Sequence, residues 1–188
     1  MGKNTRKDQR TGKMGEAAVV LKLMELGYEA FNLNNEFRNF KNADIMCFNP
    51  EANKYIMIQV KASFQKTPNF YTGFDSNRKG EIINKKLEEN IICPWVFVHI
   101  QEKRNEYVYK YYILTQEEVV NLIKDHNKWY WTEGGTHSKA TSDNQQVGLP
   151  IGVITGLNME KNGGKTYPRK IKIEAPENAW GKITNLLN

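Results

Sequence analysis

The segment NADIMCFNPEANKYIMIQVKAS, residues 42–63, decides the fold that we expect. Two short apolar runs flank the turn-forming residues NPEAN at positions 49–53, and this pattern predicts a β-hairpin. Asp44 opens the first run, while Gln59 and Lys61 close the second. Because side chains alternate between the two faces of a strand, Gln59 and Lys61 lie on the same face. We therefore expect these three polar residues to meet at one end of the hairpin.

This polar cluster has the chemistry of a cation site. A carboxylate, an amide oxygen and a backbone carbonyl are the hard oxygen ligands that a divalent cation such as Mg²⁺ prefers. A lysine beside that cation can orient a water molecule or stabilise the charge that develops on a phosphate. The structural alternative is a partly buried salt bridge between Asp44 and Lys61 at the end of a sheet. The residues alone leave both interpretations open.

A helix is predicted for residues 13–26, with Gly27 as its C-cap. At about 100° per residue, Glu16 falls in register with Val20 and Leu23, so its carboxylate faces inward. A buried carboxylate without a partner is costly, and we expect a metal, a lysine or backbone amides to satisfy it. The alternative is a glutamate favoured near the helix start by the helix macrodipole.

The composition is that of an ordinary globular domain. Hydrophobic residues make up 39% and charged residues 26%, which is ordinary for a soluble globular protein. The net charge of +6 favours a polyanionic partner only modestly. Cys47 and Cys93 lie inside apolar runs, as expected for core residues in a reducing compartment. Without a signal peptide or a run of transmembrane length, we expect a cytoplasmic protein that does not associate with membranes.

Further strands and helices are predicted around the hairpin. Thr115 followed by Glu118 is a capping box that starts a helix, and Trp180 lies on the apolar face of a terminal helix. The expected elements are a loose arm at 1–12, strands at 28–33, 94–100, 107–114 and 169–174, helices at 80–90, 115–124 and 176–187, and loops at 34–42, 65–79 and 132–148. We expect one domain, residues 1–188, with a core at about 13–126 and a less regular C-terminal extension at 127–188.

The order of these elements and their polar residues resembles the PD-(D/E)xK nuclease superfamily over roughly residues 13–114. The matching residues are Glu16 on the helix, Asp44 on the second strand, and Gln59 with Lys61 at the end of the third. Glutamine in place of the usual acid is similar to the Gln-x-Lys variant of Mrr-type restriction endonucleases. Ala43 precedes Asp44 where the superfamily often has proline. The resemblance implies an α/β, restriction-endonuclease-like three-layer fold, with a central mixed β-sheet flanked by helices.

The resemblance also implies roles for these residues. Asp44, Gln59 and the carbonyl of Val60 would bind Mg²⁺ or Mn²⁺, and Lys61 would position the attacking water or stabilise the transition state. Glu16 would bind the metal through water or tune the site. The implied activity is hydrolysis of DNA phosphodiester bonds by a restriction or defence endonuclease. The main alternative is a catalytically inactive module on the same fold that binds nucleic acid or another protein.

Four basic residues are candidates for contact with DNA. Arg78 and Lys79 follow a loop rich in aromatic residues, and Lys85 with Lys86 corresponds to a helix that carries basic residues in some relatives. A loop that packs over the edge of the core and a solvated helix face are the structural alternatives. The terminal helix with Trp180 is a candidate surface for a homodimer, which is common among enzymes that cut both strands.

Overall fold

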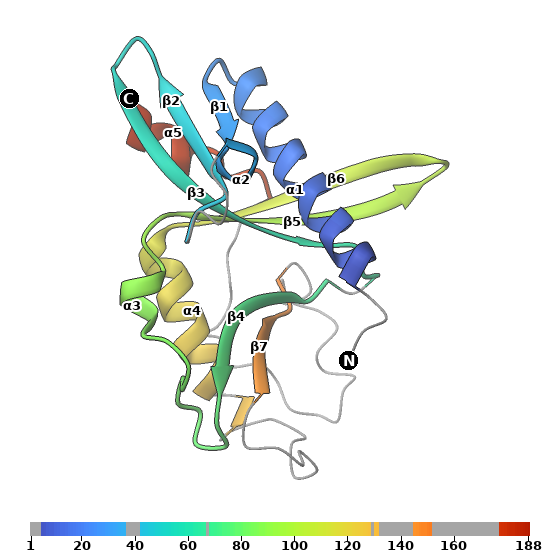
Figure 1. Cartoon of the computed structure of the whole chain (residues 1–188), viewed down its shortest axis with the longest axis vertical. Coiled ribbons are helices and arrows are strands. Elements are labelled where there is room, and N and C mark those ends of the chain that lie inside the picture. Colours follow the sequence, from blue (N-terminus) through green and yellow to red (C-terminus); the bar gives the residue numbers. More distant parts are fainter. Residues whose placement is uncertain (1–4, 37–41, 67, 129, 132–144, 152–176) are drawn as a thin grey trace.

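The computed structural model describes residues 5–36, 42–66, 68–128, 130–131, 145–151 and 177–188. Within these residues the chain forms a mixed five-stranded sheet, a smaller two-stranded sheet and helices (Figure 1). The strands of the large sheet, in spatial order, are β1 (Glu29–Asn32), β2 (Ile45–Asn49), β3 (Lys54–Ser63), β5 (Trp95–Lys103) and β6 (Glu106–Leu114). Neighbours are antiparallel except for β3 and β5, which are parallel. The α/β class is therefore confirmed.

The predicted hairpin is present as β2 and β3. Its turn is stabilised by Asn49, whose side-chain oxygen accepts hydrogen bonds from the backbone N–H groups of Glu51 and Ala52. Asn53 then adopts the left-handed conformation, with φ of 50°, which asparagine tolerates better than most residues. Local turn chemistry thus sets the register in which Ile45 lies opposite Ile58.

One face of the large sheet is covered by α1 (Thr5–Glu25) and α5 (Gly181–Leu187) (Figure 1). The helices and strands share one cluster of buried side chains, which includes Val19, Leu23, Ile58, Val60, Val96, Val98, Trp180, Ile183 and Leu187. Complete burial of one such aliphatic side chain contributes about 1.5–3 kcal/mol relative to its exposure. Helix α1 begins at Thr5, earlier than the predicted residue 13, so the prediction of a loose arm is wrong for residues 5–12, and its first four residues lie outside the described part of the chain.

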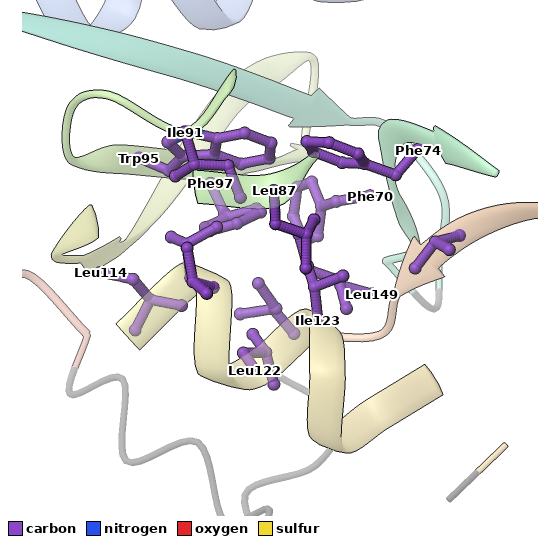
Figure 2. Close-up of a cluster of buried hydrophobic side chains, with 14 of the residues drawn as sticks. Phe70, Phe74, Leu87, Ile91, Trp95, Phe97, Leu114, Leu122, Ile123 and Leu149 are labelled. Carbon is purple, nitrogen blue, oxygen red and sulfur yellow. The ribbon is translucent and has the colours of Figure 1, made fainter. Parts of the chain in front are cut away.

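The opposite face is covered by α4 (Gln116–Lys128) and by the small sheet of β4 (Phe70–Ser76) and β7 (Gln145–Leu149). Figure 2 shows Trp95 and Phe97 of β5 packed with Phe70 and Phe74 of β4 above Ile123 of α4. The Phe70 and Phe97 rings meet edge to face, with centroids 5.3 Å apart. A sheet with hydrophobic clusters on both faces is consistent with a three-layer α/β fold.

The predicted loop at 65–79 is wrong in its second half, because residues 70–76 form β4. Alternate side chains of this strand are buried, which is the pattern of a half-buried strand. Gly73 disguises the pattern, since it adopts a φ of 83° within a register shift between Tyr71 and Asp75. The partner strand β7 begins at Gln145, within the segment 132–148 for which a loop was predicted, and ends at Leu149.

The predicted helix at 80–90 is reduced to α3 (Leu87–Asn90). In the residues before α3, asparagine side chains form hydrogen bonds with the backbone groups that a helix would otherwise use, as short polar side chains do. Asn77 accepts hydrogen bonds from the N–H groups of Lys79 and Glu81, and Asn84 accepts one from Asp75. In the segment 34–42, predicted as a loop, the short helix α2 (Leu33–Glu36) covers the first residues. The strand predicted at 169–174 lies outside the described residues.

Helix α5 confirms the apolar face predicted for the terminal helix. Trp180, which precedes it, is only 6% exposed and packs edge to face against Tyr111, with centroids 5.2 Å apart. Trp180 is therefore part of this chain's own core and is not available to a partner, while a homodimer through the rest of the terminal helix stays a prediction. None of the helices in the described part of the chain is both long and apolar enough to cross a membrane.

The capping box at the start of α4 is confirmed and links two helices. The N–H of Thr115 donates to Glu118 at 2.8 Å, and the N–H of Glu118 donates to the hydroxyl of Thr115 at 3.3 Å. Lys182 of α5 donates to both Glu118 carboxylate oxygens at 2.7 Å. Burial alone would raise the pKa of Glu118, but these hydrogen bonds outweigh it and lower the pKa below its ordinary value.

Replacement of Glu118 by glutamine is expected to reduce the free energy of unfolding by about 1 kcal/mol at neutral pH. A lowered folded-state pKa means that the charged form stabilises the fold above the ordinary carboxyl pKa. This contribution is lost as the pH falls through the folded-state value, so the two proteins should converge in acid, below that value. Urea denaturation from neutral to acidic pH measures the difference. Glu117→Gln, on the same turn and exposed, is the control, and a pH-independent difference for Glu118→Gln would contradict the assignment.

Candidate functional site

Asp44 lies at the point where β2 and β3 separate. Its backbone N–H donates to the carbonyl of Ile58 at 2.9 Å, and the next residue of β3, Gln59, donates its N–H to Pro94 at the start of β5. From Gln59 onward β3 is therefore paired with β5. It no longer pairs with β2, whose first residue, Ile45, lies opposite Ile58. The residue before Ala43, Asn42, has a φ of 68° and turns the chain away from β3.

The Asp44 carboxylate occupies the gap that this separation leaves. Its Oδ2 accepts a hydrogen bond from the backbone N–H of Val60 at 2.7 Å. Its other oxygen, Oδ1, accepts one from the side-chain amide of Asn34 at 3.0 Å. The Nε2 of Gln59 also donates to Oδ2 and lies 3.4 Å from the carbonyl oxygen of Val60. Asp44, Gln59 and Val60 are thus in direct contact.

Glu16 approaches the same place from α1. Its side chain is half-buried, and its Oε2 accepts a hydrogen bond from Asn32 of β1 at 2.6 Å. Burial raises the pKa of Glu16, and the negative charge of Asp44 raises it further, while the bond from Asn32 opposes both effects. The two carboxylates are therefore within electrostatic reach of each other, and a cation near both would relieve their repulsion.

Lys61 lies beside these acids without forming an ion pair. Its Nζ is 5.1 Å from the centroid of the Trp95 ring, which attracts a cation through the ring face. No carboxylate lies within 4.0 Å of this ammonium among the residues that the structure describes. Burial lowers the pKa of Lys61, and Lys85 lowers it further, although Asp44 and Glu16 act in the opposite direction. The salt bridge between Asp44 and Lys61 weighed as an alternative is not formed.

Of the four basic residues proposed for DNA contact, only Lys85 approaches this site. Its Nζ lies 5.6 Å from the centroid of the Phe74 ring, and its charge acts on Lys61. Lys86 is exposed and pairs with Glu89 at 2.7 Å. Both lysines precede α3, so their predicted position on a helix is wrong.

Arg78 and Lys79 are held at the other end of β4. They belong to the turn at 77–81, and Asn127 of α4 donates a hydrogen bond to the carbonyl of Gly80 in this turn at 2.6 Å. Figure 1 shows that this end of β4 points away from the large sheet. The structure therefore does not place these two basic residues beside Asp44.

Two asparagines were missed by the sequence analysis. Asn32 and Asn34 each bind one of the acids and are joined to each other, because the Oδ1 of Asn32 accepts the backbone N–H of Asn34 at 2.9 Å. The run NLNN at 32–35, which overlaps the end of a predicted strand, was the available signal. Asparagine is common in turns and at the ends of helices and strands, so the sequence alone suggested only a polar connection.

The donor atoms at this site suit a hard divalent cation. Glu16 and Asp44 supply carboxylate oxygens, Val60 a carbonyl and Gln59 an amide. Within the described ranges no group of three or more histidine, cysteine, aspartate or glutamate residues could hold a metal. A cation here would therefore depend on the carbonyl and amide oxygens as well as on the two acids.

Comparisons with protein-family models, with curated proteins and with solved structures find no match to this chain.

Close packing of α1 on β3 positions Glu16. A Cβ atom added at Gly15 would lie 2.5 Å from the Cβ of Ala62 and 3.6 Å from a methyl group of Val60. Gly12, one turn earlier on the same helix, has nothing within 4 Å of an added Cβ. The two glycines form a matched pair in which only one contacts the sheet.

Gly15→Ala is expected to destabilise the protein by about 1–3 kcal/mol, because the helix must move away from β3. Gly12→Ala should instead stabilise it by up to about 1 kcal/mol, since alanine favours the helix over glycine. Urea denaturation of both variants measures these changes. Equal stability of the two variants would show that α1 does not pack on β3 in this way.

Proposed function

We propose that this chain is a metal-dependent endonuclease that hydrolyses DNA phosphodiester bonds on a restriction-endonuclease-like fold. The proposal rests above all on the contact between Asp44, Gln59 and Val60 at the separation of two strands. Glu16 and Lys61 lie within electrostatic reach of the same point. One helix and one hairpin thus bring two acids, an amide, a carbonyl and a lysine together, which is the set that phosphodiester hydrolysis needs.

Each residue has a role that follows from its surroundings. When bound by Asp44, Gln59 and the carbonyl of Val60, Mg²⁺ or Mn²⁺ would supply Lewis-acid stabilisation of the phosphate. Among the described residues Lys61 has no carboxylate partner within 4.0 Å, so its ammonium is available to hydrogen-bond a phosphate oxygen or the attacking water. Glu16, with its raised pKa, can accept or hold a proton of that water.

Lys85 is the basic residue best placed to contact a neighbouring DNA phosphate. It is exposed, and its charge already acts at Lys61, where a bound phosphate would reduce the repulsion between the two ammonium groups. Lys86 would meet DNA only after exchanging its pair with Glu89, and Arg78 with Lys79 would meet it away from the cleaved bond. The net charge of +6 favours the same polyanionic partner.

A catalytically inactive nucleic-acid-binding module is the second candidate. Gln59 replaces an acid, and Asp44 already accepts hydrogen bonds from the neutral donors of Asn34, Gln59 and Val60, which together weaken the attraction for a cation. Binding of DNA without cleavage would select this function. The compartment that we propose is the cytoplasm, since Cys47 and Cys93 are buried free thiols of the kind kept in a reducing environment.

Cleavage of supercoiled plasmid DNA with Mg²⁺ tests the activity. Asp44→Asn and Lys61→Met should each reduce the rate by about 10²–10³-fold or more, because each removes a charge that acts in the transition state. Methionine keeps an apolar side chain over Trp95, so the fold should be preserved. Lys124→Met is the matched control, since this lysine is exposed and pairs with Glu88, and its rate should change little.

Equal cleavage by the wild type, Asp44→Asn and Lys61→Met would remove the catalytic assignment. Binding of DNA by a folded wild-type protein that does not cleave it with Mg²⁺ or Mn²⁺ would select the inactive module instead.

A further inference from the structure

The side-chain amide of Gln59 faces two atoms that can only accept hydrogen bonds. Its Nε2 donates to Oδ2 of Asp44 and lies 3.4 Å from the carbonyl oxygen of Val60. A carboxylate and a carbonyl have no proton to donate, so the amide must present its NH₂ group and not its oxygen to them. The orientation of this amide is therefore fixed by its neighbours.

The NH₂ group thus lies between the two oxygens that a cation at this site would share. Its protons carry a partial positive charge and satisfy both acceptors, as the cation would. A cation at Oδ2 of Asp44 would have to displace a donor, because the N–H of Val60 and the amide of Gln59 already use both lone pairs of this oxygen. Gln59 could coordinate the cation only through Oε1, on the other side of the same amide.

We propose that the Gln59 amide is a reversible internal substitute for the metal ion, which must rotate to exchange its NH₂ group for its oxygen before a divalent cation binds. This inference rests on the proposed metal-dependent function of the same site. It assigns Gln59 a role that an acid cannot fill, since a carboxylate has no donor with which to satisfy Asp44 and Val60.

The choice of glutamine has two consequences. Without a cation, neutral donors satisfy the Asp44 carboxylate, and Gln59 adds no negative charge to the one that Glu16 already brings. With a cation, those hydrogen bonds must be broken, and one negative ligand fewer is available to replace them. The affinity for the cation is therefore low, and occupancy depends on the cation concentration.

Gln59→Glu separates these two effects. The variant should bind Mn²⁺ at least about tenfold more tightly than the wild type, because it adds a charged ligand and removes the competing donor. Without a cation its thermal midpoint should fall below that of the wild type, since two carboxylates then face each other, and Mn²⁺ should restore it. Calorimetric titration with Mn²⁺ alone and thermal unfolding measure both effects.

Gln101→Glu is the matched control. It makes the same change of amide to acid, on β5 of the same sheet. Gln101 lies six positions beyond Trp95, and Trp95 is the residue that lies opposite Gln59. It should leave Mn²⁺ binding unchanged. Equal Mn²⁺ affinity in wild type and Gln59→Glu, or an equal gain in Gln101→Glu, would overturn the proposal.

The wild-type protein provides a test that does not depend on a variant folding. The side-chain NH₂ resonances of Gln59 should move when Mg²⁺ is added, because their protons leave Asp44 and Val60 for other partners. The side-chain amide of Gln101 should stay unchanged. Backbone signals of Asp44 and Val60 that respond to Mg²⁺ while the Gln59 NH₂ does not, or no response at all at millimolar Mg²⁺, would overturn the proposal.

These outcomes are distinct from failure of the proposed nuclease activity. A wild-type protein that binds Mn²⁺ weakly, gains affinity through Gln59→Glu and cleaves no DNA would support the role of the amide and refute the activity. Cleavage of DNA by the wild type, together with an Mn²⁺ affinity that Gln59→Glu leaves unchanged, would support the activity and refute the role of the amide.

Discussion

The hydrogen bond from the backbone N–H of Val60 to Asp44 is the interaction on which the site depends. Successive N–H groups of a strand point to opposite sides, and that of Gln59 is used by β5. The N–H of Val60 therefore points to the side on which β2 lies. At this position β2 is missing, because its pairing with β3 ends at Ile45 and Ile58. A buried N–H group needs an acceptor, and the Asp44 carboxylate replaces the missing strand. Sheet topology thereby places an acid next to the lysine one residue further along.

The same arrangement keeps the two acids of the site from forming an ion pair with the lysine. Neutral amides and one backbone N–H satisfy Asp44, and an amide satisfies Glu16, so neither acid pairs with Lys61. The lysine is held by an aromatic ring instead, which stabilises its position without neutralising it. Burial shifts the pKa values of Glu16 and Lys61 in the directions that reduce their charge. Such shifted groups in one place favour a function that involves ligands or proton transfer over a purely structural role.

Local signals in the sequence were sufficient for the hairpin, the capping box at Thr115 and the apolar face of the terminal helix. Strand β4 was missed because its partner β7 lies about seventy residues later and because Gly73 interrupts the alternation. The approach of Asp44 to Gln59 followed from the hairpin register, but the orientation of the Gln59 amide did not, since it depends on the carbonyl of Val60. The separation of Lys61 from Asp44 likewise depends on Trp95 of a strand that pairs only in three dimensions.

Hydrogen exchange at the backbone amide of Val60 tests most directly whether Asp44 replaces a strand here. In the wild type this amide should be protected like that of Ile58, within the paired hairpin. In Asp44→Ala it should exchange at least about tenfold faster, while that of Ile58 keeps its protection. Fast exchange at Val60 in the wild type, or equal protection in both proteins, would contradict the account.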